Sequence, residues 1–144
     1  MPARLKHQDS IDALDLTDCP SQNAKEKDCE AFRWCFETLD HPDTWTPQAQ
    51  KLQREGSFPR ENWSTERLCD SWALSFFNSE RNAKAVWMSI NPKLKAKMGY
   101  KNLSRGTLKK KDGLCCPTEH NGHFNFFEFE KCNLEKRFVI HSKL

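Results

Sequence analysis

The chain has no long hydrophobic run. Of its 144 residues, 37% are hydrophobic and 30% are charged, and no stretch approaches the roughly 20 apolar residues that a membrane-spanning helix needs. The segment from Met1 to Ser10 is polar and no apolar segment follows it, so it does not resemble a secretory signal. Glycine-rich phosphate loops, nucleophile elbows and His-Glu-x-x-His motifs are also missing. We therefore expect a soluble, cytoplasmic protein with no membrane partner.

Paired cysteine motifs are missing as well. The seven cysteines are odd in number and irregular in spacing, and no Cys-x2-Cys pair occurs. Secreted disulfide frameworks and common zinc sites both depend on regular spacing. We expect most of these thiols to be unpaired and buried in the core, where they behave as small hydrophobic side chains.

Acidic and basic residues are unevenly distributed. Residues 1–70 hold nine Lys and Arg against fourteen Asp and Glu, a net charge of −5, whereas residues 71–144 hold fourteen against six, a net charge of +8. Either the two halves attract one another, or the second half faces an anionic partner. The length suits one domain with a hydrophobic core. We expect residues 1–21, which are polar, to form a flexible leader, and residues 22–144 to form the domain.

The stretch from Asp70 to Asn91 carries the clearest structural signal, a strand followed directly by a helix. Large apolar residues first alternate, as in a strand with one buried face, at Trp72, Leu74 and Phe76. Ser79 is then suited to cap a helix. Apolar residues next recur with helical spacing at Ala83, Val86, Trp87 and Ile90. This strand and helix are predicted to form the centre of the fold.

Helical spacing also occurs in the first half of the chain. Its apolar positions are Phe32, Cys35, Phe36 and Leu39. They predict a helix over residues 29–39, and Pro47 predicts the start of another that ends near Glu55. The second half instead has short alternating segments between Asp-Gly and Asn-Gly turns, which predict strands at residues 103–108, 114–116, 123–130 and 137–141. The predicted fold is α+β, with a helical N-terminal half packed on a largely antiparallel sheet in the C-terminal half.

Residues of metal-ligand type gather in the last third of the chain. They are Cys115, Cys116, His120, His123 and Cys132. Zinc prefers four nitrogen and sulfur ligands in a tetrahedron, but adjacent cysteines project differently and the usual ligand spacing is missing. One interpretation is a structural zinc site, and the other is core thiols beside two loop histidines.

A lysine-rich segment follows Pro92 and contains no acidic residue before Asp112. The candidate partner-binding residues in it are Lys97, Lys101, Arg105, Lys109, Lys110 and Lys111. Such cations pair with the phosphates of a nucleic acid or with an acidic protein surface. Lysines also protect an edge strand against aggregation, which would give this segment a purely structural role.

Three short patches resemble a known enzyme family. Arg33, Ser75 and the pair Glu128 and Glu130 occur in the same order as the Arg, Ser and Glu-x-Glu elements of ADP-ribosyltransferases. The resemblance implies that the arginine grips the pyrophosphate of NAD, the serine steadies the site and a glutamate stabilises the positively charged ribose. The chain departs from the family pattern because Ser75 lacks the Ser-Thr-Ser triplet and Arg33 falls in a predicted helix.

The main functional prediction is a small intracellular binding protein without a cofactor, of the immunity, antitoxin or adaptor kind. It engages a protein or another anionic partner through its basic, aromatic-rich C-terminal half. A second hypothesis is an enzyme that performs NAD-dependent ADP-ribosyl transfer with Arg33, Ser75 and Glu128 or Glu130. The sequence is also compatible with a structural zinc domain or a nucleic-acid-binding domain.

Overall fold

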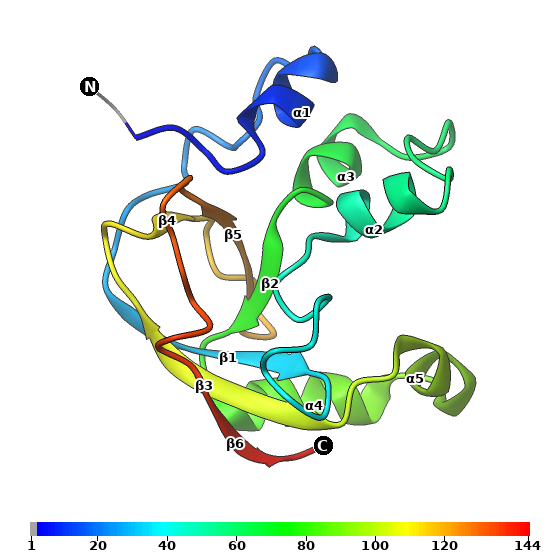
Figure 1. Ribbon diagram of the computed structural model, residues 1–144, viewed down its shortest axis with the longest axis vertical. Helices are drawn as coiled ribbons and strands as arrows, with labels where there is room; N and C mark the ends of the chain where they lie inside the picture. The colour runs from blue at the N-terminus through cyan, green and yellow to red at the C-terminus, as the bar shows by residue number, and fades with distance from the viewer. Residues whose placement is uncertain (1–2) are drawn as a thin grey trace.

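A single antiparallel sheet of six strands runs through the computed structural model, which describes residues 3–144 (Figure 1). Its spatial order is β4-β5-β2-β1-β3-β6. The strands are β1 (Cys29–Cys35), β2 (Leu74–Phe77), β3 (Asn102–Leu108), β4 (Gly113–Cys115), β5 (His123–Glu128) and β6 (Val139–Lys143). The helices are α1 (Gln8–Ala13), α2 (Gln48–Arg54), α3 (Thr65–Asp70), α4 (Glu80–Ser89) and α5 (Pro92–Met98).

The predicted helical N-terminal half is wrong. Short helices are interspersed among the strands, and residues 29–35, which were predicted to be helical, form strand β1 near the middle of the sheet. Both faces of β1 are covered, so Ala31, Phe32 and Arg33 are buried in succession. A strand buried on both faces loses its alternating pattern. The helical spacing in this segment therefore arose by coincidence.

Several local predictions are confirmed. α4 follows β2 directly, and the side chain of Ser79 caps it by accepting a hydrogen bond from the backbone N–H of Asn82. α2 begins after Pro47, as predicted. The sheet is antiparallel, but it is not confined to the C-terminal half, because β1 is one of its inner strands. None of the helices in residues 3–144 has the length and apolar composition required to cross a membrane.

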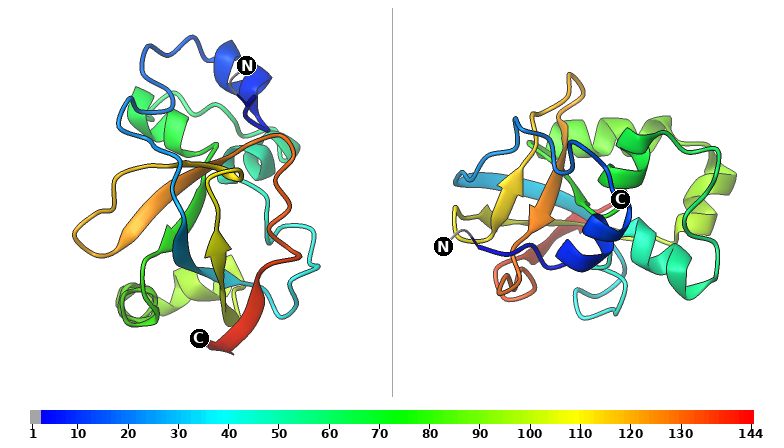
Figure 2. Two further views of the ribbon diagram at one scale, coloured as in Figure 1. Left: turned by 90° about the vertical axis from the view of Figure 1, so that its left-hand side faces the viewer. Right: turned by 90° about the horizontal axis from the view of Figure 1, so that it is seen from above.

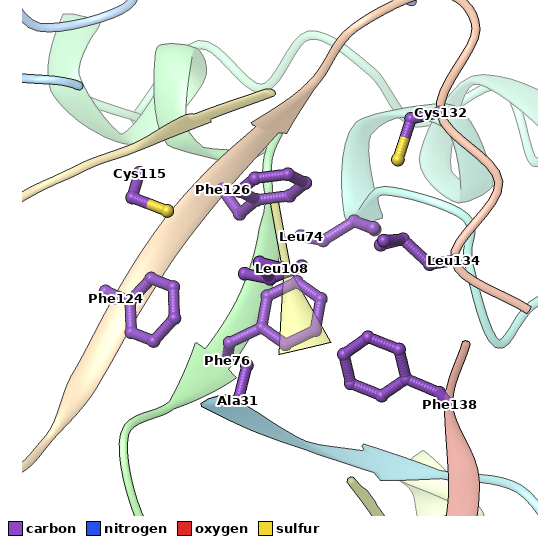
Figure 3. Close-up of a cluster of buried hydrophobic side chains, with 10 residues drawn as sticks. All are labelled: Ala31, Leu74, Phe76, Leu108, Cys115, Phe124, Phe126, Cys132, Leu134 and Phe138. Atoms are coloured by element: carbon purple, nitrogen blue, oxygen red, sulfur yellow. The ribbon is translucent and has the colours of Figure 1, made fainter. Parts of the chain in front are cut away.

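The main hydrophobic core lies on one face of the sheet (Figure 3). Phe76 of β2 is fully buried there, and its ring lies 5.9 Å from that of Phe124 and 5.7 Å from that of Phe126 between ring centroids. Phe138, which precedes β6, closes the cluster at 5.6 Å from Phe76. Aromatic pairs at these distances add roughly 0.5–1.5 kcal/mol each beyond their buried area. This packing fixes β2 against β5.

The N-terminal segment packs against the β5 end of the molecule. Leu5 pairs with Phe129, and Ile11 of α1 is buried in a cluster with Phe127. Cys19 and Cys69 form a disulfide bond. Figures 1 and 2 place α1, α2 and α3 at one end of the molecule and α4 at the other. The disulfide thus joins the segment predicted to be a leader to α3.

Candidate functional site

A cleft of about 950 Å³ lies beside the junction of β1 and β2. Residues of α2, α3 and α5 line it. These three helices lie on the right-hand side of the molecule in Figure 1. The volume lies within the range of small-molecule binding sites.

Arg33 lies in the lining of this cleft, where β1 and β2 diverge. The two strands pair at Phe32 and Phe77, so Arg33 follows the last point of contact. Its Nε and Nη2 atoms donate to the carbonyl oxygen of Thr44 at 3.0 and 2.9 Å. Its Nη1 atom donates to the carbonyl oxygen of Ser75 at 2.8 Å. The guanidinium is therefore held rigidly between β1, β2 and the loop before α2.

The charge of Arg33 is buried, and no carboxylate of residues 3–144 forms an ion pair with it. The residue is only 6% exposed; burial lowers its pKa, and the charges of Tyr100 and Glu128 oppose this effect. Among residues 3–144, its side chain donates hydrogen bonds only to backbone carbonyls, and the rings of Trp45 and Phe76 lie 5.8 and 5.6 Å from its Cζ. A guanidinium has five N–H donors, of which three are used here. A buried charge with spare donors is stabilised by an anion.

Aromatic rings form a continuous wall along the cleft. The ring of Phe77 lies 5.1 Å from that of Trp34, which in turn lies 6.2 Å from Tyr100. Phe36 is 4.9 Å from Tyr100 and stacks on His41 at 4.1 Å. We call these five residues the aromatic wall; all of them line the cleft. Such rings offer faces on which a planar ligand stacks.

Basic side chains surround the same wall. The ammonium of Lys51 lies 5.6 Å from the ring of Phe36 and 5.9 Å from that of Tyr100. Arg60, Arg67 and Lys97 also line the cleft. Asp43, Glu55, Asp70 and Glu119 line it as well, so the cleft combines stacking surface with five basic and four acidic side chains.

Ser75, His123 and Glu119 form a hydrogen-bonded chain at the other end of the cleft. The Oγ atom of Ser75 lies 3.1 Å from Nε2 of His123. The Nδ1 atom of His123 contacts a carboxylate oxygen of Glu119. All three residues line the cleft. A hydroxyl, an imidazole and a carboxylate in this sequence of contacts have the connectivity of a nucleophile, its base and the group that orients the base.

A tight turn holds His123 and Glu119 in place. The backbone N–H of Glu119 donates to the carbonyl of His123, and that of Gly122 donates to the carbonyl of Glu119. Gly122 has a φ of 85°, and a side chain there would meet the amide groups of Asn78 and Asn82 at 2.5 and 2.4 Å. The Asn-Gly turn thus fixes the ends of β5 and β2 together.

A second hollow of about 690 Å³ adjoins the cleft. The two share four lining residues, Asp70, Glu119, His123 and Asn125. Burial raises the pKa of the Asp70 carboxyl, and the neighbouring charges of Glu66 and Glu119 raise it further. His123 therefore lies where the cleft and the second hollow meet.

Neither predicted glutamate lines the cleft. Glu128 is buried, its carboxylate accepts a hydrogen bond from Lys6 at 2.7 Å, and its other oxygen has no partner among the described residues. Glu130 is exposed at the far end of β5. The structure thus brings Arg33 and Ser75 to one cleft and leaves both glutamates outside it.

The predicted metal ligands are separated. Cys115 and Cys132 lie in the main core and Cys116 in the cluster beneath α1, whereas His120 is exposed and His123 contacts Ser75. Within residues 3–144, no group of three or more His, Cys, Asp or Glu side chains is placed to hold a metal ion.

The predicted partner-binding residues are spread along the length of β3. Lys97 lies on α5 at the cleft, Lys101 precedes β3, and Arg105 forms an exposed ion pair with Glu30 at 2.6 Å. Lys109, Lys110 and Lys111 lie at the opposite end of β3, exposed in its turn to β4. Only these last three form a compact basic group.

No known family model, curated protein or solved structure matches this chain. Sequence reasoning did not single out Glu119, Trp34 or Tyr100 as site residues. Glu119 had no signal of its own, because its role depends on a contact between His123 and Ser75, which are 48 residues apart.

Proposed function

We propose that the protein is an enzyme that binds NAD in the cleft beside β1 and β2 and transfers its ADP-ribosyl group. The observation that carries the proposal is the buried guanidinium of Arg33, which has two unused donors and no carboxylate partner in the described part of the chain. A phosphate oxygen bound there supplies the missing negative charge and accepts the spare N–H groups.

The aromatic wall supports a ligand that carries flat rings as well as phosphates. Phe36 and Tyr100 have ring centroids 5.6 and 5.9 Å from the ammonium of Lys51. Stacking of a base on an aromatic side chain contributes about 1–3 kcal/mol. A dinucleotide provides both the rings and the pyrophosphate, whereas an inorganic anion uses only the arginine.

The placement of Arg33 removes one of the two departures from ADP-ribosyltransferases. It lies on the first strand and Ser75 lies on the second, directly before α4, as the resemblance requires. Glu128 and Glu130 lie outside the cleft, so this proposal assigns no role to the Glu-x-Glu element of that family.

The test is a titration of the protein with NAD and with ADP-ribose, followed by tryptophan fluorescence, together with an assay of nicotinamide release. We expect binding to weaken about 10-fold or more in Arg33→Lys, since hydrogen bonds to a charged group contribute about 1.5–3 kcal/mol. Tyr100→Ala removes stacking from a partly exposed position and provides a second variant if Arg33→Lys unfolds.

Arg105→Lys is the matched control, because Arg105 lies on β3 outside the cleft and forms an exposed ion pair with Glu30. It is expected to bind NAD as the wild type does. The proposal is wrong if millimolar NAD and ADP-ribose leave the fluorescence of the wild type unchanged, or if Arg33→Lys and Arg105→Lys weaken binding equally.

Partner binding by the basic turn is the second candidate function. Lys109, Lys110 and Lys111 are exposed, and none of them forms a salt bridge to another described residue. A protein or nucleic-acid partner with an acidic surface fits this turn. Replacing all three with Glu should abolish the salt-dependent part of partner binding while nicotinamide release persists. Unchanged binding with unchanged salt dependence would remove this candidate.

A further inference from the structure

We propose that Ser75 is an activated nucleophile, with His123 as its general base and Glu119 as the residue that orients the base, and that Ser75 itself accepts the ADP-ribosyl group. The inference rests on the proposed function for the identity of the electrophile. The activation of Ser75 rests only on the contacts of the three side chains.

The contacts assign the roles of the two imidazole nitrogens. Nδ1 of His123 faces the carboxylate of Glu119, which accepts hydrogen bonds, so this nitrogen carries the proton. Nε2 is then the acceptor, and the hydroxyl of Ser75 donates to it across 3.1 Å. This is the tautomer and the distance that a general base needs to remove the serine proton.

The surrounding backbone holds the three groups before any ligand arrives. Ser75 is paired with Asn125, and Phe77 with His123, in the ladder between β2 and β5. The turn from Glu119 to His123 is closed by two backbone hydrogen bonds. Groups on paired strands and a tight turn need little rearrangement to react.

Arg33 determines where the electrophile lies. Its Nη1 atom is bonded to the carbonyl of Ser75 itself, so a pyrophosphate bound to the guanidinium lies next to this residue. In this proposal, the ribose attached to that pyrophosphate lies at the Ser75 hydroxyl, on the face of the sheet that also carries Phe77 and His123. The cleft contains the anion-binding group and the nucleophile on adjacent strands.

The reaction balances without a further reactant. The Oγ atom of Ser75 forms a bond to the anomeric carbon of the ribose, and the bond from that carbon to the nicotinamide nitrogen breaks. The bonding electrons go to nicotinamide, which leaves as a neutral molecule, and the serine proton goes to Nε2 of His123. The product is a serine O-glycoside, which has no carbonyl for water to attack and therefore accumulates.

The experiment is intact-mass and peptide mass spectrometry of the full chain after incubation with NAD. We expect one ADP-ribosyl group per chain, on Ser75, and none in Ser75→Ala. His123→Gln is expected to slow modification by about 100-fold or more, the usual contribution of a general base. His120→Gln is the matched control: His120 is exposed in the same turn, lies outside the cleft and is expected to leave the rate unchanged.

Glu119 acts through His123 and is a positioning residue. Glu119→Gln is expected to lower the rate by about 10-fold or more without changing the thermal unfolding temperature, whereas Glu119→Asp keeps the carboxylate and recovers part of the rate. A purely structural role would instead lower the unfolding temperature in both variants and leave the rate per folded molecule unchanged.

Two outcomes separate this inference from the proposed function. Nicotinamide release without modification of Ser75 overturns the inference and leaves the proposed function intact. If the wild type neither binds nor cleaves NAD, the proposed function is wrong, and so is the assignment of the electrophile. A fluorophosphonate probe then tests the nucleophile alone: labelling of Ser75 that is lost in His123→Gln supports its activation, and labelling that is absent or unchanged in His123→Gln overturns it.

Discussion

The side chain of Arg33 reaches the backbone of Ser75, 42 residues further along the chain, with Nη1 of the arginine 2.8 Å from the serine carbonyl oxygen. The same guanidinium bonds the carbonyl of Thr44 through two nitrogens. One side chain thus ties together β1, β2 and the loop before α2 at the point where the strands separate. Arg33 therefore has two roles: it supplies positive charge to the cleft, and it holds together the segments that line the cleft.

This double role predicts a loss of stability in Arg33→Lys. A lysine has one nitrogen and cannot reach both carbonyls in the fixed fork geometry of a guanidinium. We expect the free energy of unfolding to fall by about 2 kcal/mol or more, since buried carbonyls lose a charged donor. Urea denaturation measures it. Arg105→Lys, which alters an exposed ion pair, is expected to cost less than about 1 kcal/mol; equal losses in the two variants would contradict the role of Arg33.

Gly122→Ala is expected to be more damaging than Gly56→Ala. Both glycines have left-handed φ values, 85° and 74°. A side chain at Gly56 meets nothing within 4 Å, whereas one at Gly122 meets the Asn78 and Asn82 amides at 2.5 Å or less. Backbone strain alone costs about 1 kcal/mol or slightly more. The free energy of unfolding should therefore fall by that amount in Gly56→Ala and by more in Gly122→Ala. Chemical denaturation compares the two, and equal losses would mean that the amides move aside freely.

Local signals in the sequence were sufficient to predict parts of the fold. The Ser79 cap, the spacing that predicted α4 and the alternating segments of β3 and β5 all report interactions between residues close in sequence. β1 was missed because burial on both faces removes the period on which the prediction depends. α5 was also missed, although Asn91 caps it, Pro92 begins it and Gly99 ends it.

The site was only partly predictable for a different reason. Arg33 and Ser75 were named from their order along the chain, and the cleft contains both. The contact partners of Ser75 were not identified as such: His123 was named as a candidate zinc ligand, and Glu119 was not named. The contact between Ser75 and His123 follows from the sheet order, which places β5 next to β2 across 48 residues of chain. Long-range pairings of this kind are the part of the fold that periodicity does not encode.

Glu128 predicts a specific pH dependence. Burial raises the pKa of its carboxyl, although the ion pair with Lys6 opposes this. A carboxyl whose pKa is higher in the folded than in the unfolded state stabilises the fold fully only at low pH, and this contribution is lost as pH rises through the folded pKa. In Glu128→Gln, the side chain at position 128 is an amide and does not titrate. The unfolding free energy of the variant minus that of the wild type should therefore increase as pH rises from about 4 to about 7, as measured by urea denaturation. A difference that stays constant or decreases would contradict the raised pKa.

The disulfide between Cys19 and Cys69 closes a segment with a sequence separation of 50 residues. The chain-entropy relation gives a stabilisation of about 4 kcal/mol for a loop of this length. We expect the free energy of unfolding of Cys19→Ser to be lower than that of the wild type by an amount of this order. Reductant should destabilise the wild type but not the variant. Identical urea midpoints for the wild type with and without reductant would show that the bond does not form in solution. The cytoplasmic location expected from the sequence stays a prediction, and this bond bears on it because disulfides persist mainly in oxidising compartments.

Cys29 is expected to be the most reactive of the free cysteines. A hydrogen bond from the thiol of Cys115, helped by the charge of Lys27, lowers the pKa of the Cys29 thiol to about 7 against the opposing effect of burial. Burial raises the pKa values of Cys116 and Cys132 to about 12. The thiolate is the species that reacts with iodoacetamide.

Alkylation followed by peptide mass spectrometry should therefore modify Cys29 first, with a rate that reaches half its maximum near pH 7. Cys115→Ala removes the hydrogen-bond donor, so the midpoint should move up towards the ordinary value for a thiol, whereas Cys132→Ala should leave it in place. A midpoint that is the same in Cys115→Ala and in the wild type would assign the low pKa to another cause. Because Cys29 begins β1 and Cys115 ends β4, the measurement also reports whether the edge strand β4 comes close to β1, which lies near the middle of the sheet.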